Sequence, residues 1–216
     1  MRIIGLFLAC SVCCVGYSFC DQKITYQSCC SKDVVRTDWS LEKKEDKIHL
    51  NGKRKGEEIQ MEYSSDFLLL SYLEKTEPSK ELDIVKDGPC LIIRSRDKGK
   101  EKIKSFKIGS TPWVQDWKFG LQNFLKGDRK EFSFYVVSPK DLSVYEMVAT
   151  KEIEEELNLE GRKYAAQKVK ITLKGFKKKF WKAQTWFDKG NLLMLKYRAN
   201  EGPGTPMTEI TLLEEK

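Results

Sequence analysis

The chain has 216 residues, of which 40% are hydrophobic and 33% are charged, and its formal net charge is +7. This length suits one domain or at most two small ones, and the composition excludes wholesale disorder because a packed core can form. The charge comes from many Lys and many Glu residues rather than from an Arg-rich block, which predicts a solvated surface with mild attraction to anionic surfaces.

The first 20 residues differ from the rest of the chain. Met1-Arg2 gives a short positive start, and residues 3–19 are almost wholly apolar or small and carry no charge. A run of about 17 residues is marginal for spanning about 30 Å of hydrocarbon, and it is typical of a secretory signal peptide. We predict export with cleavage before Asp21. A lipoprotein signal and an uncleaved N-terminal anchor are the two alternatives.

Three of the seven cysteines lie beyond this segment, namely Cys29, Cys30 and Cys90. Neighbouring cysteines rarely bridge each other because the disulfide would strain the peptide between them. In an oxidising compartment the sequence therefore allows one disulfide, from Cys90 to Cys29 or to Cys30. The alternative is a buried thiol at Cys90. Beyond residue 20 there is no CxxC motif or His-Cys pairing, so no metal site is predicted.

The chain after the signal begins with a predicted loose leader, residues 21–31, followed by one domain over residues 32–216. Residues 34–41 alternate apolar and polar side chains, as a strand buried on one face does. Two alternating runs are parted by Asn51-Gly52 and Lys55-Gly56, and we predict turns there, since Asn-Gly is the commonest hairpin-turn dipeptide. Further short strands are predicted at residues 67–73, 82–85, 90–94 and 103–108. Turn signals at this spacing are typical of a meandering sheet or barrel.

Residues 112–126 have a helical rather than a strand period. We predict one helix that begins at Pro112, is capped by Ser110 or Thr111, and ends at Gly127. Its apolar face would need a cover, which the concave side of a curved sheet provides. The side chains that recur on this face are Trp113, Trp117, Gly120, Leu121, Phe124 and Leu125.

Four of these residues are candidates for contacting a ligand. Trp113, Trp117, Leu121 and Phe124 would offer an apolar surface inside a bent sheet, against which an acyl chain could be buried. The alternative is that these side chains form ordinary core packing.

The rest of the chain predicts more antiparallel strands, at residues 131–137, 143–150, 151–159, 168–173, 180–187, 192–197 and 208–213. A basic and aromatic run precedes one of them. Such a run fits contact with an anionic membrane surface or a partner protein. Stacking on nucleic acid and a merely solvated hairpin tip are the alternatives, and nucleic acid is not a predicted partner. The run consists of Lys177, Lys178, Lys179, Phe180 and Trp181.

Motifs that carry catalysis are missing from the sequence. There is no GxSxG, P-loop, GxGxxG or HExxH pattern, and the single histidine, His49, has no accompanying Ser or Cys motif. We therefore predict a protein that is not an enzyme and that needs no cofactor.

Part of the sequence resembles the C-terminal half of certain exported bacterial proteins. The segments that carry the resemblance are residues 160–164, the strand at 168–173, the Trp-Phe-Asp-Lys-Gly run at 186–190 and the closing strand at 208–213. Those proteins resemble the LolA/LolB lipoprotein carriers, whose architecture is an unclosed antiparallel β-barrel with an apolar hollow capped by helices. The resemblance covers about residues 100–213. It implies a fold and a compartment, the periplasm or outer membrane of the bacterial envelope, and it transfers no catalytic residue.

These observations together predict a mainly β domain, a curved antiparallel sheet or half-open β-barrel with one packed amphipathic helix. The predicted function is the binding of a hydrophobic ligand, such as an acyl chain or a lipid-modified partner. The alternative is a structural protein that docks a partner protein or an anionic membrane through the basic aromatic hairpin. The sequence does not predict an oligomeric state.

Overall fold

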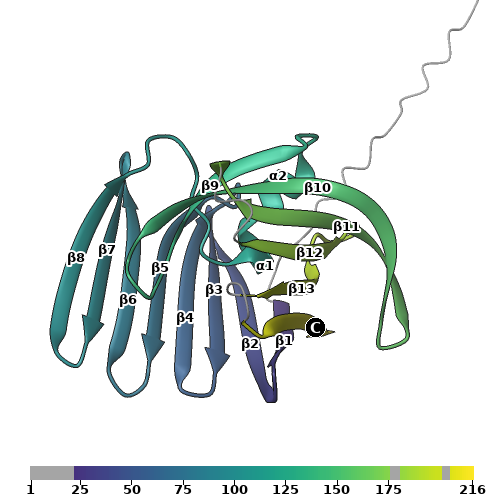
Figure 1. Ribbon diagram of the computed structural model, residues 1–216, viewed down its shortest axis with the longest axis horizontal. Helices are drawn as coiled ribbons and strands as arrows, with labels where there is room; N and C mark the ends of the chain where they lie inside the picture. The colour runs from purple at the N-terminus through teal and green to yellow at the C-terminus, as the bar shows by residue number, and fades with distance from the viewer. Residues whose placement is uncertain (1–21, 176–180, 201–204) are drawn as a thin grey trace, which may run out of the picture.

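The computed structural model describes residues 22–175, 181–200 and 205–216, and within them one antiparallel sheet of fourteen strands dominates (Figure 1). The first eight strands are β1 (Gln22–Cys30), β2 (Asp33–Lys44), β3 (Lys47–Arg54), β4 (Glu57–Ser64), β5 (Leu69–Thr76), β6 (Lys80–Asp87), β7 (Cys90–Asp97) and β8 (Lys100–Lys107). The other six are β9 (Glu131–Val137), β10 (Val144–Leu159), β11 (Arg162–Leu173), β12 (Lys182–Asp188), β13 (Met194–Asn200) and β14 (Met207–Glu215).

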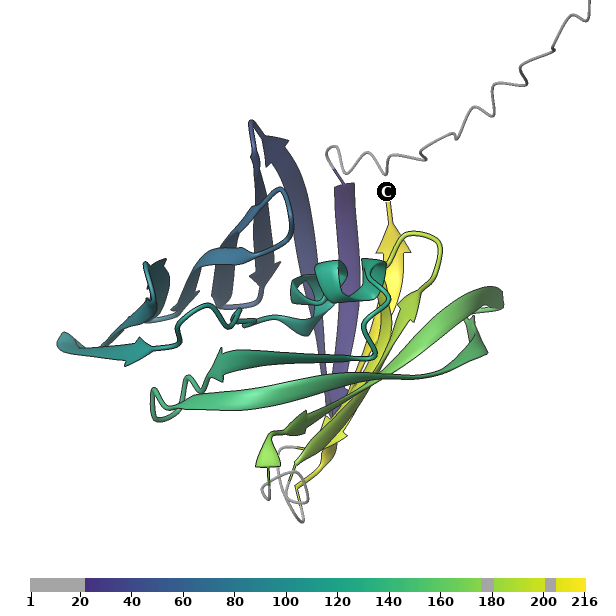
Figure 2. The same cartoon turned by 90° about the horizontal axis from the view of Figure 1, so that it is seen from above.

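The sheet consists of two meanders joined in the middle. In the N-terminal meander, β1–β8, and in the C-terminal meander, β9–β14, each strand pairs with the next one in the chain, and β1 pairs with β14. The strands near the two ends of the chain are therefore central, and β8 and β9 are the edges. Figure 2 shows the sheet curling so that these edges approach each other without pairing. The predicted curved, half-open sheet is confirmed.

The concave side of the sheet holds the core. In β2, for example, Trp39 and Leu41 are buried inward, and the paired strand β3 adds Ile48 and Leu50. Of the two turns predicted here, the one at Asn51-Gly52 is wrong because this dipeptide lies inside β3. The one at Lys55-Gly56 is confirmed, and Gly56 has a φ of +72°. Gly52 serves packing: a Cβ there would lie 2.8 Å from ring carbons of Trp39.

Two further boundaries differ from the prediction. The expected loose leader forms β1, a central strand whose Ile24 and Tyr26 are buried. The two strands expected at residues 143–150 and 151–159 are one long strand, β10, with an irregularity between Lys151 and Glu154. Its outer part pairs with β11 alone, and this hairpin projects beyond the neighbouring strands (Figure 1).

The helical segment lies inside the concave side, as predicted, but it begins later and is interrupted. It comprises α1 (Trp117–Gly120) and α2 (Gln122–Lys126), which meet at Leu121. The start at Pro112 is wrong because this part of the chain is extended and pairs with β9: Tyr135 N–H donates to the Pro112 carbonyl, and Val114 N–H donates to the Tyr135 carbonyl. Gly127 ends the segment, as predicted.

Polar side chains fix both ends of this segment. The Asp116 carboxylate accepts the Lys118 backbone N–H at 2.8 Å and caps α1. At the other end, the Lys151 ammonium donates to the carbonyls of Leu125 and Gly127, as cations at helix C-termini do. Burial lowers the pKa of Lys151.

The disulfide that the sequence allows is not formed in this structure. Cys29, Cys30 and Cys90 are all free thiols and half-buried. Five strands separate β1 from β7 in the sheet, with about 4.8 Å between neighbouring strands, whereas a disulfide needs Cα atoms within about 7 Å. In the described ranges no helix is long and apolar enough to cross a membrane. Residues 1–20 lie outside these ranges, so the signal peptide stays a prediction.

Candidate apolar binding site

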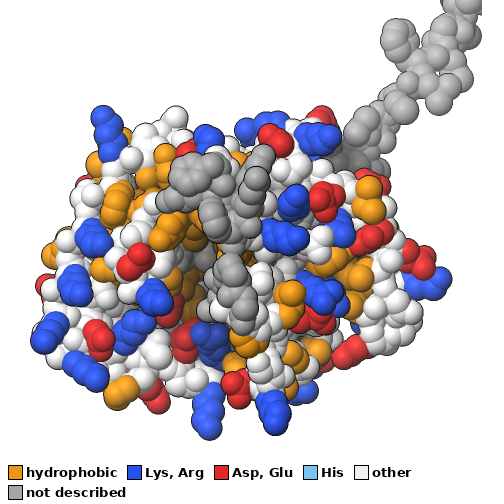
Figure 3. Space-filling view, viewed as in Figure 1, with side chains coloured by type: hydrophobic (Ala, Val, Ile, Leu, Met, Phe, Trp, Pro, Cys, Tyr) orange, Lys and Arg blue, Asp and Glu red, His pale blue; other side chains and the backbone are white. Residues whose placement is uncertain are grey.

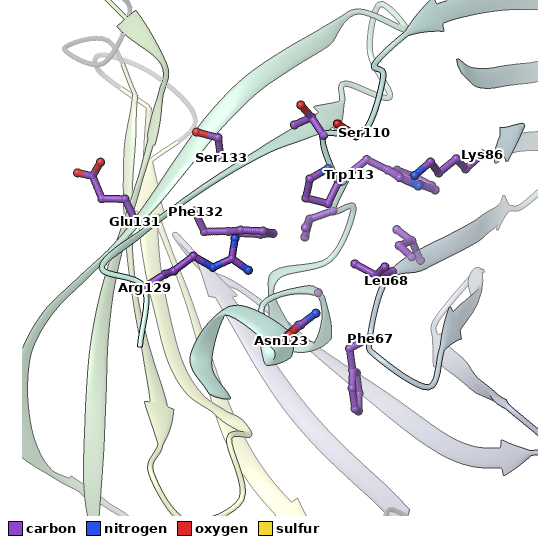
Figure 4. Close-up of a pocket in the computed structure, with 15 residues that line it drawn as sticks. Phe67, Leu68, Lys86, Ser110, Trp113, Asn123, Arg129, Glu131, Phe132 and Ser133 are labelled. Atoms are coloured by element: carbon purple, nitrogen blue, oxygen red, sulfur yellow. The ribbon is translucent and has the colours of Figure 1, made fainter. Parts of the chain in front are cut away.

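A cavity of about 410 Å³ opens on the concave side of the sheet. It lies where the β4–β5 turn, residues 110–120 and the start of β9 meet (Figure 4). Figure 3 shows a hollow on this face with hydrophobic side chains along its wall. Seven of the fifteen lining residues are apolar, namely Phe67, Leu68, Leu69, Pro112, Trp113, Val114 and Phe132.

Phe67 reaches this wall through an unusual backbone conformation. Its φ is +57°, in the left-handed region that a bulky residue rarely adopts, at a cost of about 1–3 kcal/mol. The turn is held by Ser64, which accepts the N–H of Phe67 at its carbonyl and the N–H of Leu68 at its hydroxyl. The Phe67 ring is buried, and the Lys126 ammonium lies 5.0 Å from its centroid. Contacts of the buried ring thus accompany the strained turn, and in Figure 4 this ring extends away from Phe132 and Trp113.

An aromatic row runs from the cavity across the helical segment and β9. Its members are Phe132, which lines the cavity, and Phe124, Phe134, Trp117 and Trp181. Phe132 stacks on Phe124 and on Phe134 with 5.5 Å between ring centroids in each pair. Trp117 then contacts Phe134 at 5.6 Å and Trp181 at 6.5 Å. Offset and edge-on contacts of this kind stabilise the packing beyond the area they bury.

The four residues predicted to contact a ligand occupy different places. Trp113 lines the cavity. Leu121 and Phe124 are fully buried and are absent from the cavity lining; Phe124 supports Phe132 from behind. Trp117 is half-buried within the aromatic row. The role of these four in binding stays a prediction.

The predicted basic hairpin falls largely outside the described residues, which exclude Lys177, Lys178, Lys179 and Phe180. Trp181 is described and is half-buried against Trp117. Its contact with a membrane or partner stays a prediction.

Sequence reasoning missed two cationic residues of the cavity, Lys86 and Arg129. The signal for Lys86 was present in the sequence, because Leu82, Ile84 and Lys86 alternate and therefore share one face of β6. Arg129 lies in the connection that follows the helical segment, where no periodicity indicates which way a side chain points. Glu131 is the other ionisable residue of the described lining.

A second polar cluster, away from the cavity, holds α1 against the sheet. Lys118 and Asp116 form an ion pair that is largely shielded from solvent, and the Lys118 ammonium lies 5.1 Å from the Trp39 ring and 5.8 Å from the Tyr26 ring. Burial, together with the negative charge of Asp116, raises the pKa of Tyr26 and of Tyr63 well above the usual value. Both phenols stay neutral. The cluster therefore positions the helical segment, and in the described residues no group of His, Cys, Asp and Glu is arranged to hold a metal ion.

No protein-family model matches the sequence, and no curated protein matches it. Among solved structures, the chain is similar to a β-barrel-like protein of a domain of unknown function, DUF1849, from Brucella abortus. The TM-score is 0.64 at 7% identity, over 92% of this chain and 98% of that one. At this identity the likeness shows the fold alone, and that fold is the half-open barrel described above.

Two other solved structures align over most of this chain at lower TM-scores. One is a hypothetical lipoprotein from Escherichia coli, with a TM-score of 0.38 and 13% identity over 90% of this chain and 84% of that one. The other is a LolA superfamily protein from Nitrosomonas europaea, with a TM-score of 0.26 and 9% identity over 93% and 87%. A LolA superfamily protein is thus among the structures that align with this chain. At these TM-scores the likeness carries no argument about function.

Proposed function

We propose that the protein is a non-enzymatic binding protein of the bacterial cell envelope, which holds an apolar chain in the concave-side cavity. The chain would be the acyl group of a lipid or of a lipid-modified partner. The observation that carries the proposal is the cavity itself. Its volume of about 410 Å³ lies within the range of about 300–1,000 Å³ that is usual for small-molecule sites. The signal-like residues 1–20 support the envelope location.

The chemistry of the lining favours binding over catalysis. Neither histidine nor cysteine lines the cavity in the described part of the chain. The lining therefore has no histidine to act as a general base and no cysteine to act as a nucleophile. Leu68, Trp113 and Phe132 instead offer apolar side chains. Each methylene group that an acyl chain buries there contributes about 0.8 kcal/mol to binding.

The test measures the binding of neutral apolar compounds, using the environment-sensitive dye N-phenyl-1-naphthylamine. We expect the dye to bind the purified protein with a rise in fluorescence, and dodecanol to displace it. Leu68, at 44% exposure, lies on the cavity wall. Leu68→Asp should weaken dodecanol binding at least tenfold, because a carboxylate at this position is unfavourable beside an alkyl chain.

The matched control is Val34→Asp, the same change at an apolar residue that is 61% exposed and does not line the cavity. Its affinity for dodecanol should equal that of the wild type. The proposed function is wrong if neither the dye nor dodecanol binds the folded wild-type protein. It is equally wrong if both Asp variants bind dodecanol as the wild type does.

A further inference from the structure

We infer that the ligand is an amphiphile with an anionic head, a carboxylate or a phosphate monoester, whose oxygens are bound by the Lys86 ammonium and the Trp113 indole N–H. The inference rests on the proposed function, since the apolar wall would hold the tail. It adds a head-group chemistry that the apolar wall alone does not require.

Lys86 lies on the same face of β6 as the buried Leu82 and Ile84, and the exposed Lys80 stands at the other end of that face. In the pairing of β6 with β7 Lys86 lies opposite Leu91, and Ile84 lies opposite Ile93, so these four residues share the concave face. Leu91, Ile84 and Ile93 are fully buried, and Lys86 is half-buried at the end of this stripe. A cation among apolar neighbours is unfavourable unless it is paired. No ion pair or hydrogen bond involves the Lys86 ammonium within the described residues.

Trp113 supplies the second donor. Its side chain is 2% exposed, and its indole Nε1 has no hydrogen-bond partner among the described residues. A buried donor that is left unpaired lowers stability, so such groups usually have a partner. Lys86 and Trp113 line the same cavity, and in Figure 4 the Lys86 side chain extends toward the Trp113 ring. Both residues thus bring a donor without an acceptor to this part of the molecule, and an anionic head bound between them would supply the acceptors.

The other charged groups of the lining agree with this assignment. Figure 4 shows the Arg129 guanidinium directed toward Phe132, whereas the Glu131 carboxylate extends in the opposite direction. Both residues are exposed. The charge directed into the cavity is therefore positive, which favours an anion over a cation.

The experiment compares four twelve-carbon competitors of the bound dye below their micelle-forming concentrations: dodecanoate, dodecyl phosphate, dodecanol and dodecylamine. For the wild type we expect dodecanoate, dodecyl phosphate or both to displace the dye at concentrations at least tenfold below dodecanol. Dodecylamine should be weaker than dodecanol. If only one anion has the advantage, that result identifies the head group as carboxylate or phosphate.

Lys86→Met keeps most of the side chain but removes the charge. It should abolish most of the anion preference, measured as the ratio of the anion and dodecanol affinities of the same variant. Lys107→Met removes a charge from an exposed lysine of β8 that does not line the cavity, and should retain the preference. Trp113→Phe keeps a ring but removes the indole N–H, and should reduce the preference independently of Lys86.

The outcomes separate the two proposals. If dodecanol competes as well as both anions in the wild type, the anionic head is wrong and the apolar site stands. If the wild type prefers anions and Lys86→Met and Trp113→Phe both keep the full preference, the inference is also wrong. If the dye itself does not bind, and dodecanol and the anions do not bind either, both the anionic head and the proposed function are wrong.

Discussion

The two meanders bury their strands in different ways. In the N-terminal meander one face is apolar, and the other is polar and carries ion pairs between neighbouring strands, such as Arg94–Asp83 at 3.0 Å. In the C-terminal meander three consecutive residues of β12, Thr185, Trp186 and Phe187, are buried. Trp186 is shielded on the outer face, where its indole N–H donates to Glu155 of the projecting β10–β11 hairpin.

This difference assigns different roles to the two meanders. The strand at the centre of the C-terminal meander is packed from both sides, which makes it the more rigid platform. The N-terminal meander is covered on its concave side alone, and it ends in β8, an edge strand whose side chains are mostly exposed. The cavity lies where the β4–β5 turn and Lys86 of the one-sided meander face the start of β9. A binding site between a rigid part and a less rigid part of the sheet can change its shape through movement of the less rigid part.

The largest effect is expected from Phe187→Ala, in the doubly packed strand. Phe187 is fully buried, and removing such a ring should lower the free energy of unfolding by about 3–5 kcal/mol. The measurement is urea denaturation followed by both circular dichroism and tryptophan fluorescence. Because β1 pairs with β14 across the junction, we expect one transition with both probes. Ile153→Ala is the control, at 64% exposure in the same meander, with a change below about 0.5 kcal/mol. Separate transitions would show that the meanders unfold independently.

The contrast between the meanders also explains how far the sequence could predict the fold. Strands β2–β4 were found because their apolar side chains all face one way, which produces a clean alternation. β1 was missed because it is central only through its pairing with β14, from the other end of the chain. Such non-local pairing leaves no local signal. Local turn propensity at Asn51-Gly52 was overridden by the packing of Trp39 against Gly52.

The candidate site was predicted in part. The helical period correctly placed residues 117–126 inside the curved sheet, but periodicity does not distinguish a side chain that lines a cavity from one that fills the core. Trp113 does the former and Leu121 the latter. Phe67 lies in the β4–β5 turn and Phe132 in β9, and these two segments line the same cavity only because the sheet curls. Lys86 was accessible to sequence reasoning, as a charged residue at an inward position of an alternating strand.

A smaller effect is expected from Gly52→Ala, which tests the one-sided meander. The new methyl group would lie 2.8 Å from the Trp39 ring, and that ring is itself held by an edge-on contact with Phe119 at 5.2 Å. Such overpacking should lower the free energy of unfolding by about 1–3 kcal/mol. Gly127→Ala is the matched control, because its Cβ would meet no atom closer than 3.8 Å. If Gly52→Ala is as stable as this control, the ring can shift, and the N-terminal meander is less tightly packed than its burial indicates.

The smallest effect concerns the place where the open edges of the two meanders meet. Lys104 of β8 donates to the Asp141 carbonyl, in the turn between β9 and β10, at 2.8 Å. Hydrogen bonds from Ser138 and from the hydroxyl and backbone N–H of Ser143 lower the pKa of the Asp141 carboxyl from 3.8 to about 2. Because the folded pKa is below the unfolded one, the stabilisation is fully present above the unfolded value and is lost as pH falls toward 2.

Ser143→Ala removes one of these donors and should raise the Asp141 pKa toward 3.8. The remaining bonds from Ser138 and the backbone should keep it below that value. A carboxyl-carbon NMR titration from pH 6 to about 1.5 measures the shift. Ser95→Ala on β7 is the control that leaves the pKa unchanged, because Ser95 is not among the hydrogen-bond donors to the Asp141 carboxylate. An unchanged Asp141 pKa in Ser143→Ala would mean that the turn is not ordered by this carboxylate. The turn would then depend on its backbone hydrogen bonds, in which Leu142 N–H donates to the Ser138 carbonyl and Ser138 N–H donates to the Ser143 carbonyl.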